Sequence, residues 1–349
     1  MRQYLSLPMA LATIALTDVA FTAPLGAQER HVLTGATAFI WNLAGEVRLE
    51  PGTGSDVVVE VTRGGDDGRR LDVSASGGRL RIVYPASDIV YRAGREGRSS
   101  TTLTVREDGT FGGDWGRGGR RVRVRTSGSG MEAHADLRVQ VPPGKRVEVH
   151  LALGDVTVEN VDGDLRLDVH SASIRTSGTK GRLSLDAGSG SVRVDDAEGE
   201  LEVDTGSGST SVTRFSGQLV NVDAGSGSVT LREVTASRVS VDVGSGSVRA
   251  EALGTDDLSV ETGSGGVEVA LTKVPKDTEI DTGSGSVRIE LPANTNADLD
   301  IQTGSGGIST DFPVTMDKMH RRELRGRIGQ GGSRITVSTG SGGVRLIKR

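Results

Sequence analysis

The sequence predicts an all-β fold, a β-solenoid in which a single chain coils through parallel, β-helix-like rungs of about 19 residues. Three observations predict it. A Gly-Ser motif recurs at near-constant spacing, the stretches around it alternate apolar and polar residues, and only 3% of the residues are aromatic. Alternation with a period of two indicates half-buried strands. Such short strands bury their apolar face only by stacking on neighbouring copies, around a narrow core of Val, Leu and Ile.

The motif, seen in LDAGSGSVRV (185–194), occurs eight times. Its first glycines stand at Gly188, Gly206, Gly225, Gly244, Gly263, Gly283, Gly304 and Gly340. Successive intervals are 18 to 21 residues, except for a last one of 36. An antiparallel meander or sandwich is the alternative, because its hairpins could give a similar spacing. The strict single period favours the solenoid.

The N-terminal residues 1–27 resemble a signal peptide. Arg2 provides the positive charge, Leu5–Leu16 an apolar run, and the stretch ending at Ala27 a small-residue cleavage site. No later segment reaches the roughly 18 apolar residues that a membrane span needs. The chain has no cysteine, hence no disulfide and no lipoprotein acylation site. We expect an exported protein that is periplasmic, on the cell surface or secreted.

The rest of the chain divides into two parts. Residues 28–146 form a less regular β-rich region, in which the basic, glycine-rich segment 92–119 is predicted to be a mobile loop. Residues 147–349 form the Gly-Ser repeat solenoid, beginning with two weaker copies of the motif. The charged insertion 315–332 explains the long last interval and is predicted to be a surface excursion from one rung.

Composition excludes several function classes. A net charge of −5 and a pI of about 5.7 give no reason to expect nucleic acid as a partner. The absence of cysteine excludes thiolate metal sites and cysteine nucleophiles. The pattern of the Gly-Ser motif also excludes a phosphate-binding loop, because such a loop occurs once, between a strand and a helix, whereas this motif recurs between strands.

An acidic residue stands two positions before the first-glycine position in seven successive copies, namely one weaker copy, which has His170 at that position, and the first six Gly-Ser copies. These residues are Asp168, Asp186, Asp204, Asp223, Asp242, Glu261 and Asp281. In a parallel stack they lie about 4.8 Å apart and repel one another. Either each carboxylate accepts a backbone N–H in an Asx-turn, or divalent cations, most plausibly calcium, lie between them. Gln302 and Ser338 hold the position in the other copies, which favours the turn.

Two further sets of polar residues are interpreted as structural. The middle serines of the motif form a second column, predicted to be a hydrogen-bonded ladder, with a polysaccharide-facing array as the alternative. His150 and His170 are expected on adjacent rungs, without a nucleophile or a metal-spaced partner. The sequence therefore predicts no catalytic, cofactor-binding or metal-binding residue.

A family resemblance follows from particular stretches. The signal-like start, IWNLAGEVRLEP (40–51), ADLRVQVPPGKRVEVHLALGDVTVENVDG (135–163) and the serial L-x-V-D-x-G-S-G-S-V-x-V together resemble the bacterial adhesin-like family of Gly-Ser β-strand repeats, a domain of unknown function. The resemblance covers roughly residues 35–349. It implies a solenoid-like fold and an envelope setting, and it supplies no catalytic residues.

These observations predict a non-enzymatic, adhesin-like scaffold or binding protein of the bacterial envelope or surface. Its expected partner is an envelope protein or a glycan. One competing class is a glycan-active enzyme on a β-helix, which requires a cleft with clustered acids on long loops. Another is an accessory protein of envelope stress or signalling. The tight, glycine-rich corners favour the scaffold.

Overall fold

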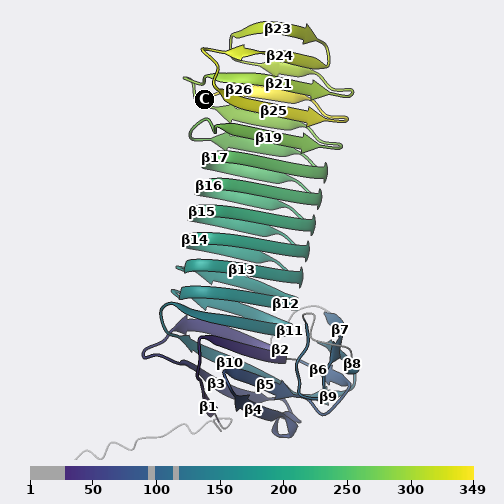
Figure 1. Ribbon diagram of the computed structural model, residues 1–349. Helices are drawn as coiled ribbons and strands as arrows, with labels where there is room; N and C mark the ends of the chain where they lie inside the picture. The colour runs from purple at the N-terminus through teal and green to yellow at the C-terminus, as the bar shows by residue number, and fades with distance from the viewer. Residues whose placement is uncertain (1–27, 93–98, 113–117) are drawn as a thin grey trace, which may run out of the picture.

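The structure is a computed structural model, which describes residues 28–92, 99–112 and 118–349. It is all-β, with a long and largely parallel sheet of consecutive strands (Figure 1). The predicted signal peptide 1–27 and parts of the predicted loop 92–119 lie outside the described residues. Within the described ranges, no helix is long and apolar enough to cross a membrane. One short 3-10 helix, η1 (Gly68–Arg70), lies in the N-terminal region.

Seven long strands make up the centre of the sheet, and each pairs in parallel with the next (Figure 1). They are β11 (Lys145–Glu159), β12 (Asp162–Ser177), β13 (Lys180–Ser189), β14 (Val192–Ser207), β15 (Thr210–Ser226), β16 (Val229–Ser245) and β17 (Val248–Ser264). The register places equivalent motif positions side by side, so that Asp186 pairs with Asp204 and Asp204 with Asp223. We call each repeat along this stack a layer.

Alternating side chains divide each layer into a buried and an outward face. In β14, Leu201, Val203 and Thr205 are buried, whereas Glu202 and Asp204 point outward. The buried Val, Leu, Ile and Ala side chains of all layers join into one continuous core. This is the half-buried pattern that the sequence predicts, repeated from layer to layer.

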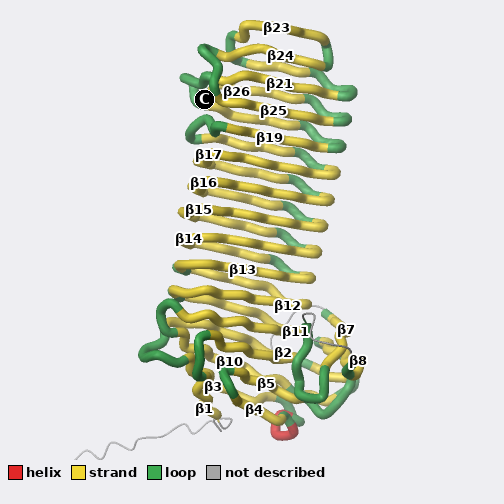
Figure 2. The backbone as a smooth tube through the Cα atoms, viewed as in Figure 1, coloured by secondary structure: helices red, strands yellow, loops and turns green. Residues whose placement is uncertain are grey.

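The corner of each layer requires glycine because the backbones of neighbouring layers approach closely there. Gly208 has φ +149°, and a Cβ at this position would lie 2.0 Å from the carbonyl oxygen of Gly190 in the preceding layer. In the C-terminal layers threonine also fixes the corner from inside: Thr262 Oγ1 donates to the Gly265 carbonyl at 3.1 Å, and Thr303 Oγ1 to the Gly306 carbonyl at 2.8 Å. These corners are the short loops between strands in Figure 2.

At the C-terminal end, spatial order departs from sequence order. β25 (Ser333–Thr339) lies between β19 (Asp277–Thr282) and β21 (Ala297–Thr303), pairing with both in parallel. The predicted excursion 315–332 falls largely in β23 (Val314–His320) and β24 (Glu323–Ile328), an antiparallel pair in which β24 covers the other edge of β21 (Figure 1). The shorter strands of these layers are β18 (Val267–Leu271), β20 (Val287–Leu291), β22 (Ile308–Thr310) and β26 (Val344–Lys348).

At the other end, parallel pairing is not limited to the repeats from residue 147 on, since it also includes strands of the N-terminal region. β2 (Thr37–Pro51) pairs with β11 in parallel, and β5 (Arg79–Val83) pairs with β2 in parallel. Four further strands complete this end of the sheet: β1 (Gln28–Leu33), β3 (Val57–Gly64), β4 (Asp72–Ser76) and β10 (His134–Val141). β3 pairs in antiparallel register with β1 and β10, and β4 does so with β5, while β10 also pairs with β2 in parallel.

A separate four-stranded sheet lies beside the base of the stack (Figure 1). It consists of β6 (Asp88–Val90), β7 (Ser100–Val105), β8 (Arg120–Arg125) and β9 (Met131–Glu132). The prediction that 92–119 is a loop throughout is therefore wrong for residues 100–105. The alternation in STTLTV buries Leu103 and Val105, and β7 pairs with β8 in antiparallel register.

Candidate functional site

The acidic column of the central layers continues to the N-terminal end of the stack, but there it contains other residue types. The register follows it from Asp186 through Asp168 to His150, then to Trp41 and Arg81. Trp41 and His150 thus occupy, in the two basal layers, the position that a carboxylate occupies above. A patch of aromatic and basic side chains replaces the acidic column there.

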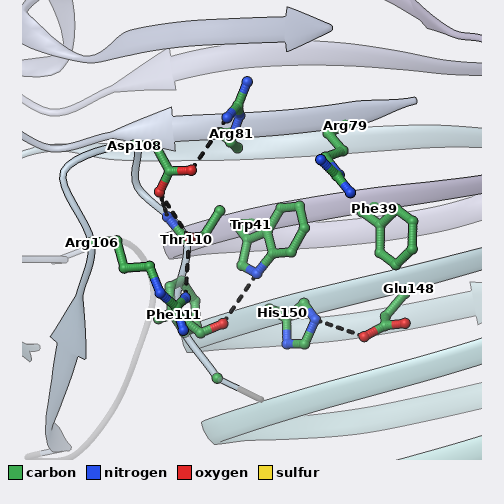
Figure 3. Close-up of a pocket in the computed structure, with 11 residues that line it drawn as sticks. Phe39, Trp41, Arg79, Arg81, Arg106, Asp108, Thr110, Phe111, Glu148 and His150 are labelled. Atoms are coloured by element: carbon green, nitrogen blue, oxygen red, sulfur yellow. Dashed lines mark hydrogen bonds and ion pairs between the residues drawn. The ribbon is translucent and has the colours of Figure 1, made fainter. Parts of the chain in front are cut away.

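Two strands place three rings next to one another. Phe39 and Trp41 lie two residues apart on the outer face of β2, while Ile40 between them points into the core. Phe39 is half-buried, and Trp41 is itself buried, with 7% of its surface exposed. Their rings are tilted by only 12° with centroids 5.9 Å apart. The His150 ring from β11 lies 5.3 Å from Trp41 with an interplanar angle of 3°. Figure 3 shows the three rings side by side in nearly parallel planes, and the ring pairs are stacked. His150, like Trp41, is buried, with 5% of its surface exposed. We call these three rings the aromatic surface.

The segment 106–112 packs onto this surface from one side. Trp41 Nε1 donates to the carbonyl of Phe111 at 3.1 Å, and the Phe111 ring is buried against His150 and His170 with centroids 6.3 and 6.0 Å apart. Gly112 crosses over the histidine with φ +73°, where a Cβ would lie 3.2 Å from His150 Nδ1. His150 and His170 therefore lie in adjacent layers, as predicted, and both contact the same ring.

His150 is held between two carboxylates. Its Nδ1 lies 3.0 Å from Asp168 Oδ2 and its Nε2 lies 3.0 Å from Glu148 Oε1. The ring donates to both only in its doubly protonated form. Burial by itself would raise the pKa of Asp168, but the hydrogen bond and charge of His150 hold that pKa below its ordinary value. The pair of carboxylates thereby fixes the ring orientation beside Trp41.

These elements enclose a pocket of about 250 Å³ (Figure 3). Its lining is aromatic at the centre and carries three guanidinium groups and two carboxylates around it, from Arg79, Arg81, Arg106, Asp108 and Glu148. Arg79 Cζ lies 5.8 Å from the centroid of the Phe39 ring. Arg81 lies 3.3 Å from Asp108, and Arg106 donates to Thr110 Oγ1 at 3.1 Å.

The charges of this lining are incompletely paired. In the part of the chain that the structure describes, no carboxylate lies within ion-pair distance of Arg79 or Arg106, and the buried Nε of Arg81 has no hydrogen-bond acceptor. Burial would raise the pKa of Asp108, yet hydrogen bonds from Thr110 and Arg81 lower it below its ordinary value. Among the described residues, Arg79 and Arg106 thus line the pocket without a carboxylate partner, whereas Arg81 is paired with Asp108.

The acidic column has the predicted register, but the Asx-turn interpretation is wrong. Asp186, Asp204 and their counterparts lie within strands and point outward, and no hydrogen bond to a corner N–H is found for them among the described residues. Partial burial and the charges of Asp168 and Asp204 raise the pKa of Asp186. In the described ranges, no three His, Asp or Glu side chains are arranged to hold a metal ion, so nothing supports the row of cations.

The middle serines are also in the predicted register, as in Ser207 beside Ser226. Where their hydroxyls donate, the acceptors are backbone carbonyls of the adjacent layer rather than other hydroxyls. Ser189 Oγ lies 3.4 Å from the His170 carbonyl oxygen, and Ser305 Oγ lies 3.3 Å from that of Ser341. The column thus contributes contacts between layers at the corner.

Sequence reasoning did not identify Phe39, Trp41, Phe111 or the three arginines as a site. One signal was available. TAFIWNLAGEVRLE aligns with VEVHLALGDVTVE when Gly45 is matched to Gly154, and this alignment places Trp41 opposite His150. In a chain with so few aromatic residues, an F-x-W pair on an outward strand face indicates a binding surface.

Comparisons with known proteins give one family match and one structural match to report. The family model described as Toastrack DUF4097 matches residues 42–346. No curated protein matches the chain. Among solved structures, the chain is similar to a "putative cell adhesion protein" from Clostridium sporogenes, with 9% sequence identity and a TM-score of 0.23, over 92% of this chain and 99% of that one.

Proposed function

Since the chain belongs to the Toastrack DUF4097 family, we propose that it is a non-enzymatic, adhesin-like binding scaffold of the bacterial envelope. The observation that carries the proposal is the pocket at the base of the stack. Flat aromatic rings with a few convergent polar groups are the usual lining of a ligand site. The pocket is built on strands β2 and β11, which are paired along most of their length and hold its shape.

As part of this proposal, we infer that the parallel strands form a β-solenoid. Support comes from the register of β14 to β17, in which every motif position meets the equivalent position of the next copy. A coil of this kind is stabilised by contacts between neighbouring layers and forms an extended, stiff support. The pocket then lies at the N-terminal end of a stiff rod. The number of layers sets the distance between the pocket and the C-terminal end of the rod.

The two carboxylates that line the pocket, Asp108 and Glu148, support binding without catalysis. Glycoside hydrolysis requires a carboxylic acid that keeps its proton near neutral pH, which means a raised pKa. The pKa of Asp108 is lowered instead, and Glu148 is engaged by His150. Export is supported by the signal-like residues 1–27.

A binding screen of the mature chain, starting at residue 28, tests this function. We expect the protein to retain an envelope glycan or an envelope protein without changing it, and Phe39→Ala to weaken the binding while Arg193→Gln on a distant layer leaves it unaltered. Turnover of any glycan in the same mixtures would exclude the non-enzymatic role. A mature protein that retains no member of either set would exclude the binding role.

A further inference from the structure

We propose that the basal pocket binds an acidic sugar residue, a pyranose ring that carries one carboxylate, as a unit of an anionic glycan. This inference rests on the proposed binding function and specifies its ligand. It follows from the shape of the aromatic surface, the size of the pocket and the balance of charges around it.

The surface suits the flat C–H face of a pyranose ring. Phe39, Trp41 and His150 line the pocket with nearly parallel rings, and the half-buried Phe39 is the most open of the three. The pocket volume of about 250 Å³ lies below the range of drug-sized sites. It therefore holds one ring-sized unit, and neighbouring units of a chain would lie outside it.

The polar groups suit both hydroxyls and a carboxylate. Figure 3 places Arg79 beside Phe39 and Arg106 beside Phe111, on either side of Trp41. A guanidinium binds a carboxylate through two parallel hydrogen bonds, and neither of these arginines has a carboxylate partner among the described residues. Asp108 and Glu148 accept hydrogen bonds from hydroxyl groups of the same ring.

The charge balance favours one negative charge over two. The lining has three guanidinium groups and two carboxylates, an excess of one positive charge. A positive charge on the His150 ring would be cancelled by the negative charge of Asp168, which it contacts, so this pair leaves the excess unchanged. A monocarboxylate neutralises it, whereas a phosphate monoester, with a charge of about −1.5 to −2 at neutral pH, would add repulsion from Asp108 and Glu148. A cationic ligand is disfavoured by all three arginines.

Calorimetric titration of the mature protein with three probes tests the inference. The probes are a linear tetramer of galacturonic acid, the same tetramer as its methyl ester, and adenosine monophosphate. We expect the acid to bind about tenfold or more tightly than the ester, because the ester keeps the ring and loses the charge. The affinity for the acid should fall as salt is added.

A matched pair of variants locates the effect. Arg79→Gln with Arg106→Gln should remove the preference for the acid over the ester, whereas Arg193→Gln should keep it. If the double variant does not fold, as judged by circular dichroism, Arg79→Gln alone serves, since Arg79 is exposed.

The outcomes separate this inference from the proposed function. Equal affinity for acid and ester would overturn the acidic ligand and leave a glycan-binding role. Tighter binding of adenosine monophosphate would overturn the sugar. A protein that retains another ligand in the screen but binds neither tetramer would overturn the inference alone.

Discussion

At the residue scale, the second glycine of each motif carries the closest contact between layers. A methyl group at Gly208 would lie 2.0 Å from a backbone carbonyl oxygen, which no rotamer change can relieve. Gly208→Ala should therefore lower the free energy of unfolding by about 3 kcal/mol or more. Urea titration followed by circular dichroism measures the loss.

Gly307 provides the matched control, because nothing lies within 4 Å of a Cβ built there. Gly307→Ala should change stability by less than about 0.5 kcal/mol. A similar loss for both variants would show that glycine at the corner serves chain flexibility rather than close packing.

Two adjacent members of the acidic column should respond oppositely to pH. The pKa of Asp168 is lowered, so its carboxylate stabilises the fold above the ordinary value near 4, and this contribution is lost as pH falls. The pKa of Asp186 is raised by partial burial and by its neighbours' charges, so its charge destabilises the fold increasingly as pH rises through that raised value.

At pH 7, Asp168→Asn should cost about 1 to 2 kcal/mol, whereas Asp186→Asn should slightly raise the stability, because solvent screens the repulsion at this exposed position. Both differences should shrink between pH 7 and pH 3. Stability curves of the two variants and the unaltered protein at both pH values check this. Two changes of the same sign at pH 7 would contradict the charge assignment in the column.

At the scale of elements, the β23–β24 pair protects the end of the parallel sheet. β24 covers an edge of β21 that would otherwise present unpaired N–H and C=O groups. Leu324 is buried in β24, so Leu324→Asp should detach the pair and cause association that increases with protein concentration. Light scattering after size-exclusion chromatography detects it.

Thr315→Asp, on the exposed side of β23, is the control and should keep the mass of the unaltered protein. The protective role would be wrong if the Leu324→Asp protein kept that mass while the amides of β24 lost their protection from hydrogen exchange.

At the scale of the whole molecule, the fold was largely predictable and the site was not. The spacing of Gly206, Gly225 and Gly244 predicts the register, because each copy meets its own equivalent in the next layer. The position of β25 between β19 and β21 was not predictable, since the copies are too similar to specify which neighbours pair.

The pocket escaped prediction for a physical reason as well. Trp41, Arg81 and Phe111 come together only because a parallel strand and a loop from distant parts of the chain cover the same face of β2 and β11. The corners, in contrast, were predicted to rely on Asp186 and its counterparts. In the C-terminal layers they are held instead by buried threonines such as Thr262, whose inward position follows from the same alternation.

The central claim is that the aromatic surface around Trp41 is the binding site, and tryptophan fluorescence tests it most directly. The chain has two tryptophans, so Trp115→Phe leaves Trp41 as the single emitter. Titration of this variant with the ligand retained in the screen should change the Trp41 emission and saturate at the affinity measured by calorimetry. Calorimetric binding with unchanged Trp41 emission would contradict the claim.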